Sequence, residues 1–171
     1  MKLESVGYRY SQEDLAALMA LSGARAIPGL PLEAPDRASL ADAVVRFEKR
    51  NIATVVGGKI AVERVPLFLM RQLASCADYL CVRAGDAFAA LYRCKKLDIL
   101  LFRGVAGWTV QPVAPTASPE AHLRRLFGRI GAEAAAELCV GGVLKKETYP
   151  AGERGALLLL YQALPPREPA K

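Results

Sequence analysis

The sequence predicts an α+β protein in which a central antiparallel sheet, a meander, is flanked by short helices. Up to about Asp78, apolar residues recur at helical spacing in short amphipathic segments. Beyond Asp78, four short apolar or alternating runs follow in close order, as strands do; they span residues 79–84, 87–94, 97–103 and 108–113. The links between these runs are short, which forces neighbouring strands to lie antiparallel.

The first two helices have recognisable start and stop signals. Ser11 and Asp14 form an S-x-x-D cap in front of an apolar stripe, and Gly23 ends that helix. Ser39 and Asp42 repeat the cap in front of a second helix, which ends near residue 50 or 51. Between the two helices, residues 25–35 contain three prolines and predict an ordered loop.

A hairpin and a third helix lead from there to the sheet. Gly57 and Gly58 separate two short apolar runs, residues 54–56 and 59–62, and so predict a two-residue hairpin turn. Pro66 suits the first turn of a third helix that runs to about Ala74. This helix is apolar on nearly all sides, so we expect it to be buried between layers.

The chain after residue 113 is harder to assign. Residues 1–113 are expected to hold the helices and the meander, and residues 114–164 a helix and a C-terminal hairpin that complete the same domain. The helix opens at Ser118 and Pro119, and a helical pattern resumes over residues 132–138 until Gly141 and Gly142 stop it. Residues 143–149 and 156–164 fit two strands joined across 150–155, which we favour, although the second segment equally fits a terminal helix. Residues 165–171 are expected to be a disordered tail.

Nothing in the sequence matches the pattern of an active site. His122, the single histidine, is expected to be an exposed helix residue beside two arginines. The cysteines have no CxxC spacing and no histidine partners, so we expect reduced thiols rather than metal ligands; they are Cys76, Cys81, Cys94 and Cys139. We therefore predict no catalytic residues, no metal and no cofactor, and a protein that is not an enzyme.

Composition points to a partner rather than to a membrane. The apolar share of 53% indicates either a well-filled core or an apolar surface that meets another protein. The formal charge of +6 is spread over small clusters, which solvated faces explain as well as nucleic acid does. Residues 1–10 do not resemble a signal peptide, and the longest apolar runs are too short to span a bilayer. Together with reduced thiols, this predicts a cytoplasmic protein without membrane insertion.

A DNA-binding role is the alternative. Three short helices followed by a β-hairpin is the element order of a winged helix, with residues 65–74 as the recognition helix and 79–94 as the wing. Two features weigh against it. The candidate recognition helix offers few polar or cationic side chains for base edges, and the sheet continues past the wing for two further strands.

Two groups of residues resemble the EspG-like proteins, which are cytosolic secretion-associated chaperones of ESX (type VII) systems. The first is the opening Tyr10-Ser11-Gln12-Glu13-Asp14-Leu15, followed by Leu18, Leu21, Gly23 and Ile27-Pro28-Gly29-Leu30. The second is the helix of residues 40–50, then Asn51-Ile52, Gly57-Gly58-Lys59-Ile60 and the Leu-rich residues 67–73. The resemblance covers about residues 8–113, in a chain shorter than a typical member. It implies a largely antiparallel sheet flanked by helical bundles, no catalytic residues, and binding of helical export substrates.

We therefore expect an adaptor or chaperone-like protein that buries an apolar helix of a secreted partner in a groove. The candidate partner-binding residues are Gly57, Gly58 and Lys59 of the hairpin, and Trp108. Trp is enriched at interaction hot spots, although a lone Trp on a strand more often covers the core. Self-association is a further way in which the apolar excess could be covered.

Overall fold

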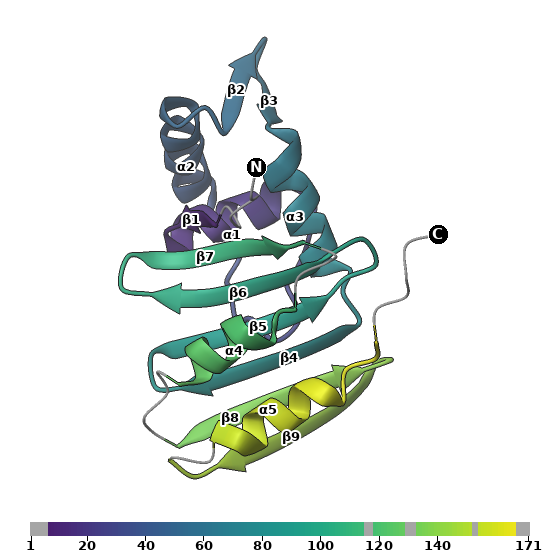
Figure 1. The fold of residues 1–171 in the computed structure, drawn as a ribbon. Helices are drawn as coiled ribbons and strands as arrows, with labels where there is room; N and C mark the ends of the chain where they lie inside the picture. The colour runs from purple at the N-terminus through teal and green to yellow at the C-terminus, as the bar shows by residue number, and fades with distance from the viewer. Residues whose placement is uncertain (1–6, 115–117, 129–132, 152–153, 167–171) are drawn as a thin grey trace, which may run out of the picture.

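Seven strands form one antiparallel sheet in the computed structural model, which describes residues 7–114, 118–128, 133–151 and 154–166 (Figure 1). Across the sheet the strands run in the order β1-β7-β6-β5-β4-β8-β9. Their bounds are β1 Tyr8–Tyr10, β4 Asp78–Ala84, β5 Ala87–Arg93, β6 Asp98–Gly104, β7 Gly107–Val113, β8 Ala134–Val140 and β9 Val143–Tyr149. Strands β4 to β7 are consecutive neighbours, so the predicted meander is confirmed, as is the α+β class.

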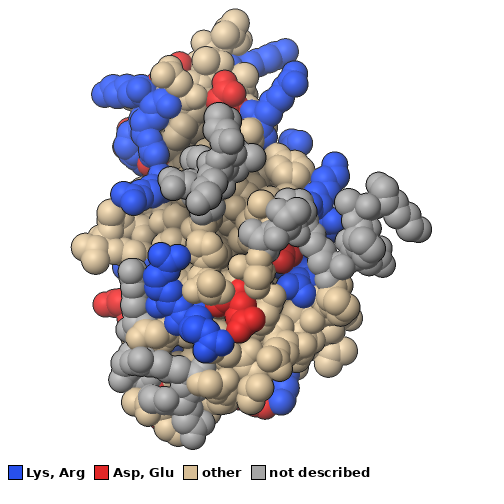
Figure 2. Space-filling model, in the orientation of Figure 1, with Lys and Arg blue, Asp and Glu red and all other residues tan. Residues whose placement is uncertain are grey.

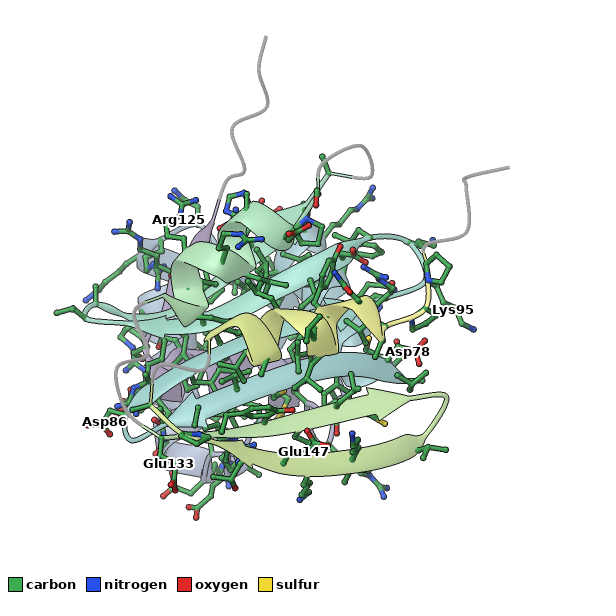
Figure 3. The ribbon with its side chains drawn as sticks, turned by 60° about the horizontal axis from the view of Figure 1, so that its bottom comes forward. Asp78, Asp86, Lys95, Arg125, Glu133 and Glu147 are labelled. Atoms are coloured by element: carbon green, nitrogen blue, oxygen red, sulfur yellow. The ribbon has the colours of Figure 1, made fainter. Side chains whose placement is uncertain are left out.

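Helices cover both faces of this sheet. On one face lie α1 (Gln12–Leu21), α2 (Arg37–Lys49) and α3 (Arg64–Ala74), with α1 packed against the other two. On the other face lie α4 (Glu120–Phe127) and α5 (Arg154–Gln162), which Figure 3 shows in front of the sheet. Alternation along β4 feeds both cores: Leu80 and Val82 belong to the α4–α5 side, and Cys81 between them belongs to the α1–α3 side.

The helix starts follow local hydrogen bonding. The Ser11 hydroxyl accepts a hydrogen bond from the Asp14 amide at 3.1 Å, so the predicted cap of α1 is confirmed. The predicted cap of α2 is wrong. Asp36, not Ser39, is the N-cap residue, and its Oδ1 accepts from the Ser39 amide at 2.7 Å. An aspartate one turn upstream supplies an equally good acceptor, so the helix begins earlier.

The third helix differs from its prediction. Leu69, Met70 and Leu73 of α3 are buried on the sheet, whereas Val65 and Arg71 face solvent. The helix therefore covers one face of the sheet and is not enclosed between layers. Pro66 lies in its first turn, where a missing N–H removes no helical hydrogen bond.

One edge of the sheet was not expected. β1 pairs antiparallel with β7, with Tyr10 opposite Trp108. The close approach depends on Gly107, whose φ is 111°, because a Cβ there would lie 2.6 Å from the Tyr10 carbonyl oxygen. Strand β1 is thus the edge strand of the sheet next to β7, and the chain continues from it into α1.

The C-terminal part requires two corrections. The segment expected to be helical, residues 132–138, is largely strand β8, in which Ala134, Ala136 and Leu138 alternate into the core. The segment favoured as a strand, 156–164, is largely helix α5, in which Leu157 and Leu160 face that core. The hairpin accordingly turns at Gly141 and Gly142 and not across 150–155. Because β8 pairs with β4, residues 134–149 belong to the same sheet as the meander. The expected tail falls mostly outside the described residues, at 167–171.

None of the helices in the described ranges is both long and apolar enough to cross a bilayer.

Candidate partner-binding surface

A second, two-stranded sheet projects from one end of the molecule, beyond α2 and α3 (Figure 1). It consists of β2 (Ala53–Val56) and β3 (Lys59–Val62). Gly57 and Gly58 have φ of 58° and 73°, as the type I′ turn of a two-residue hairpin requires. Glycine adopts such positive φ without steric cost, which is why this position turns so tightly. The predicted hairpin turn is confirmed.

The hairpin exposes apolar side chains on both of its faces. On one face, an apolar stripe runs from buried Ala53 outward to Val55 and Ile60, each 42% exposed. On the other face, Val56 is 72% exposed. Together Val55, Val56 and Ile60 are called the hairpin surface below. From base to tip the cross-strand pairs are Ala53–Val62, Thr54–Ala61, Val55–Ile60 and Val56–Lys59.

The hairpin is fastened to the body along one edge only. The amide of Val55 donates to Glu48 Oε1 of α2 at 3.1 Å, so the outer edge of β2 faces that helix. In a hairpin with a two-residue turn, the alternation of the ladder points the main-chain groups of Ile60 outward as well. Among the described residues no third strand pairs with β2 or β3, so the edge of β3 remains open.

The chain enters and leaves the hairpin through two fixed points. Asn51 adopts a left-handed conformation, with φ of 54°, just after α2. The next amide, that of Ile52, donates to the Phe47 carbonyl at 2.8 Å and closes the helix end. After β3, the Glu63 amide donates to the Ile52 carbonyl at 2.8 Å. The base of the hairpin is therefore held firmly even though its tip stands in solvent.

A cavity of about 370 Å³ lies at this base. Its walls come from β1, from the end of α2 and from the start of α3. Five lining residues are apolar or aromatic and the others are charged or polar. The lining comprises Tyr8, Tyr10, Ile52, Val65 and Pro66, together with Arg9, Arg50, Asn51 and Glu63.

One arginine at the cavity is held in place from several sides. Arg50 forms an ion pair with buried Asp14 at 3.2 Å, and its guanidinium also donates to the Arg9 carbonyl at 2.7 Å. The same guanidinium lies 5.7 Å from the centre of the Tyr10 ring. Burial raises the pKa of Tyr10 to about 12, and the Arg50 charge opposes that rise in part. Tyr10 is therefore neutral at physiological pH, and the arginine supplies a fixed positive charge.

The surroundings of the hairpin are basic. Residues 37–64, which form α2, the hairpin and the start of α3, contain six Lys or Arg residues and three Asp or Glu residues. Figure 2 shows Lys and Arg side chains on both sides of this end of the molecule. An acidic partner would be attracted to this end, because opposite charges raise the rate of encounter.

The predicted partner-binding residues do not all meet. Gly57, Gly58 and Lys59 lie together at the hairpin tip, where all three are exposed. Trp108 instead lies in the core beneath α1–α3, where it is 6% exposed and packs edge-to-face on Phe88 at 5.2 Å. The structure thus gives Trp108 a packing role, and the hairpin surface does not include it.

The other residues considered from the sequence are also placed. His122 on α4 is half-buried, not exposed as expected, and its Nδ1 lies 3.1 Å from the guanidinium of Arg125. All four cysteines are buried thiols. Burial raises the pKa of Cys81 to about 12, so that thiol is unreactive at neutral pH. Within the described part of the chain, no three His, Cys, Asp or Glu residues form a group that could hold a metal ion.

No protein-family model matches this chain, and no curated protein matches it.

The sequence predicted the turn of this surface and the apolar runs on either side of it, but not that their side chains are exposed. Val55 and Val56 are adjacent, so one of them must lie on each face of the hairpin. Adjacent apolar residues are also typical of a strand buried on both faces. Only the structure shows that apolar side chains on both faces remain exposed here.

Proposed function

We propose that this protein is a non-catalytic adaptor or chaperone-like protein that binds an apolar helix of a partner on the β2–β3 hairpin. One observation carries the proposal: Val55, Val56 and Ile60 are exposed on a hairpin that projects from the body. An isolated hairpin is marginally stable in water, and exposed apolar side chains that lie side by side, as Val55 and Ile60 do, mark interaction sites. A partner would stabilise the hairpin and remove these side chains from water at the same time.

The three exposed side chains supply a part of the free energy that binding needs, since micromolar affinity corresponds to about 8 kcal/mol. Full burial of a Val or Ile side chain contributes about 1.5–3 kcal/mol, so three half-exposed side chains offer roughly 2–4 kcal/mol together. The cavity at the hairpin base extends this apolar area towards Ile52 and Val65. An amphipathic helix with residues spaced i, i+3, i+4 and i+7 presents the matching stripe.

The charge of this end of the molecule narrows the choice of partner. Lys59 lies at the tip of the hairpin and Arg64 just after its base, and residues 37–64 carry a net charge of +3, from six basic and three acidic residues. The fitting partner helix is therefore apolar on one face and acidic at its borders. In keeping with the EspG-like resemblance, we propose that it belongs to a secreted helical protein of a type VII-like system and is bound in the cytoplasm.

DNA binding by a winged helix is the alternative, and it has less support. The strands considered as the wing, β4 and β5, are interior strands of the sheet. The helix considered for base recognition, α3, packs Leu69, Met70 and Leu73 against that sheet. The basic charge of the hairpin end is the one feature that favours it.

The test compares three proteins as baits in an extract of the native cells. They are the wild type, the double variant Val55→Ser with Ile60→Ser, and Leu159→Ser. Leu159 is an exposed apolar residue of α5, away from the hairpin, and serves as the matched control. We expect the wild type and the control to retain a small helical secreted protein, identified by mass spectrometry. With that partner purified, we expect the hairpin variant to bind at least tenfold more weakly.

Three outcomes would count against the proposal. Equal binding by all three proteins would remove the hairpin from the site. Recovery of nucleic acid alone, together with a salt-dependent shift of duplex DNA, would favour the alternative. Turnover of a small molecule by the wild type would contradict a non-catalytic role.

A further inference from the structure

The strand β9 is a long, uncovered edge of the main sheet. Its seven residues pair with β8 on one side, and among the described residues no strand pairs with the other side. Val143 is 75% exposed and Leu144 is 48% exposed on this strand. An open edge with apolar side chains is a template for a further strand unless something pairs with it.

The main-chain groups that point outward along β9 can be assigned. Gly141 and Gly142 form a two-residue turn, with φ of 57° and 81°, so the flanking pair Val140–Val143 is hydrogen-bonded. Alternation then directs the N–H and C=O groups of Leu144, Lys146 and Thr148 away from β8.

The pairing of β8 with β4 gives the same assignment of outward-pointing main-chain groups on β9. The turn at Gly85 and Asp86 makes Ala84–Ala87 the hydrogen-bonded pair that closes the β4–β5 hairpin. By alternation Arg83 then points its main-chain groups towards β8, where its partner is Ala135. Ala135 therefore faces β4, and its neighbour across the β8–β9 ladder, Thr148, faces outward.

We propose that two copies of this chain pair their β9 strands antiparallel about a two-fold axis at Lys146. Lys146 then lies opposite Lys146 of the second copy, and Leu144 lies opposite Thr148. All of these residues point main-chain groups outward, so the two edges exchange roughly six hydrogen bonds. The two sheets become one continuous sheet with a closed, isologous interface.

Side chains on the α5 side of the sheet favour this register. Lys145 of each copy lies opposite Glu147 of the other, and Val143 lies opposite Tyr149. Each opposite-charge or apolar pair of this kind contributes roughly 0.2–1 kcal/mol. Lys145 and Glu147 already form an ion pair within one chain, so their side chains stand on the same face, and Figure 3 shows Glu147 at this margin of the sheet.

Side chains on the other face of the sheet, the α1–α3 side, are also compatible with this register. Leu144 packs across Thr148, and only the two Lys146 side chains have like charge. Each Lys146 forms an ion pair with Glu137 of its own chain at 3.3 Å, which reduces their repulsion.

Neighbouring registers are less favourable. An axis at Lys145 places two Lys145 side chains opposite each other and sets Val143 against Glu147. An axis at Glu147 places two carboxylates opposite each other. Charge pattern and outward main-chain groups thus agree on the axis at Lys146.

This pairing is separate from the proposed partner site, because the hairpin and β9 lie at opposite ends of the molecule (Figure 1). An experiment can therefore refute the dimer without refuting partner binding at the hairpin, and the reverse.

The first test measures mass in solution by light scattering after gel filtration. We expect the wild type to have twice the mass of one chain at micromolar concentration. Lys146→Pro removes the central outward N–H without removing a hydrogen bond to β8, and proline is tolerated on a strand edge in that orientation. Lys146→Ala keeps the N–H and removes the same ion pair. We expect the proline variant to be monomeric and the alanine variant to remain a dimer. A monomeric wild type, or a dimer that survives in the proline variant, would overturn the proposal.

The second test does not depend on how the proline variant folds. Lys146→Cys places two thiols opposite each other, at a Cα separation of about 5.5 Å that a disulfide can span. Thr148→Cys is the matched control on the same face, because its two copies lie about 13 Å apart in this register. Mild oxidation should link the first variant into a covalent dimer and leave the second as single chains. Linkage of the second alone, or of neither, would exclude this axis.

Discussion

Two hairpins of this protein turn through the same tripeptide but occupy different places in the fold. Val56-Gly57-Gly58 joins β2 to β3, and Val140-Gly141-Gly142 joins β8 to β9. All four glycines have positive φ, between 57° and 81°, so both turns are of type I′. Yet β8 pairs with β4 in the main sheet, whereas the β2–β3 hairpin forms a sheet of its own.

The difference shows that a turn sets the register of a hairpin but not its place in the fold. In β8, three side chains reach the core beneath α4 and α5, namely those of Ala134, Ala136 and Leu138. In the β2–β3 hairpin, Ala53 alone is fully buried. The first hairpin must therefore unfold with the whole domain, and the tip of the second can open by itself.

The largest contrast should come from paired truncations of apolar side chains. Leu138→Ala creates a cavity in a packed core and should lower the free energy of unfolding by roughly 2–5 kcal/mol. Val55→Ala removes methyl groups that already face water and should cost less than about 0.5 kcal/mol. Urea denaturation of both variants measures this. Similar losses would mean that the β2–β3 hairpin also belongs to the cooperative unit.

The glycines give a matched comparison of the turns themselves. A Cβ at Gly58 or at Gly142 would meet no atom within 4 Å, so alanine at either position adds backbone strain alone. Left-handed strain costs about 1–2 kcal/mol. We expect Gly142→Ala to lose that amount in global unfolding, and Gly58→Ala to lose almost none while its hairpin amides exchange faster. Thermal denaturation and hydrogen exchange distinguish the two effects.

A carboxylate fastens the β8–β9 hairpin and makes it sensitive to acid. Burial raises the pKa of Glu137, but the hydrogen bond from Tyr79 and the charges of Lys146 and Arg83 outweigh this and leave the pKa lowered. A lowered pKa means that Glu137 stabilises the fold above its unfolded pKa, and that this contribution disappears as pH falls through the folded value. Stability curves of the wild type and Glu137→Gln should converge between about pH 5 and pH 3. Parallel curves would show that Glu137 contributes nothing to the acid response.

A carboxylate, that of Glu48, also fastens the β2–β3 hairpin. Its removal should change the global stability less than the preceding changes do. Glu48 accepts the Val55 amide in a position open to water. Glu48→Ala should change global stability by less than about 1 kcal/mol, because water replaces the lost acceptor. The Val55 amide should nevertheless exchange faster than in the wild type, which nuclear magnetic resonance can follow. An unchanged exchange rate would mean that Glu48 does not hold the hairpin.

The meander was predictable because its strands follow each other with short links, which leaves one arrangement. The C-terminal part was not, for two physical reasons. Alanine is a good helix former, so Ala134–Val140 suggests a helix until its alternation is given more weight than its composition. In Arg154–Gln162, consecutive leucines satisfy helical and strand periods alike, and only packing against α4 and into the core shared with β8 decides.

The candidate site was predictable only in part. Glycines at two successive positions signalled the turn of the β2–β3 hairpin, since few other residues adopt that conformation. Trp108 was predicted to belong to the same surface. Its pairing with the unpredicted strand β1 and its contact with Phe88 place it in the core instead. Exposure of Val56 depends on which elements fail to cover it, and no local pattern encodes that.

The unequal lengths of the two outer strands limit how far this sheet can grow. At one border, β1 offers three residues before the chain turns into α1; at the other, β9 offers seven. In the described part of this sheet, three residues are too few to hold an added strand, so only the β9 border can recruit a neighbour. A filament of paired sheets needs two pairing edges on each sheet, and the described part of the seven-stranded sheet has one. Even in concentrated solution, therefore, strand addition to this sheet should stop at a pair and not continue into filaments.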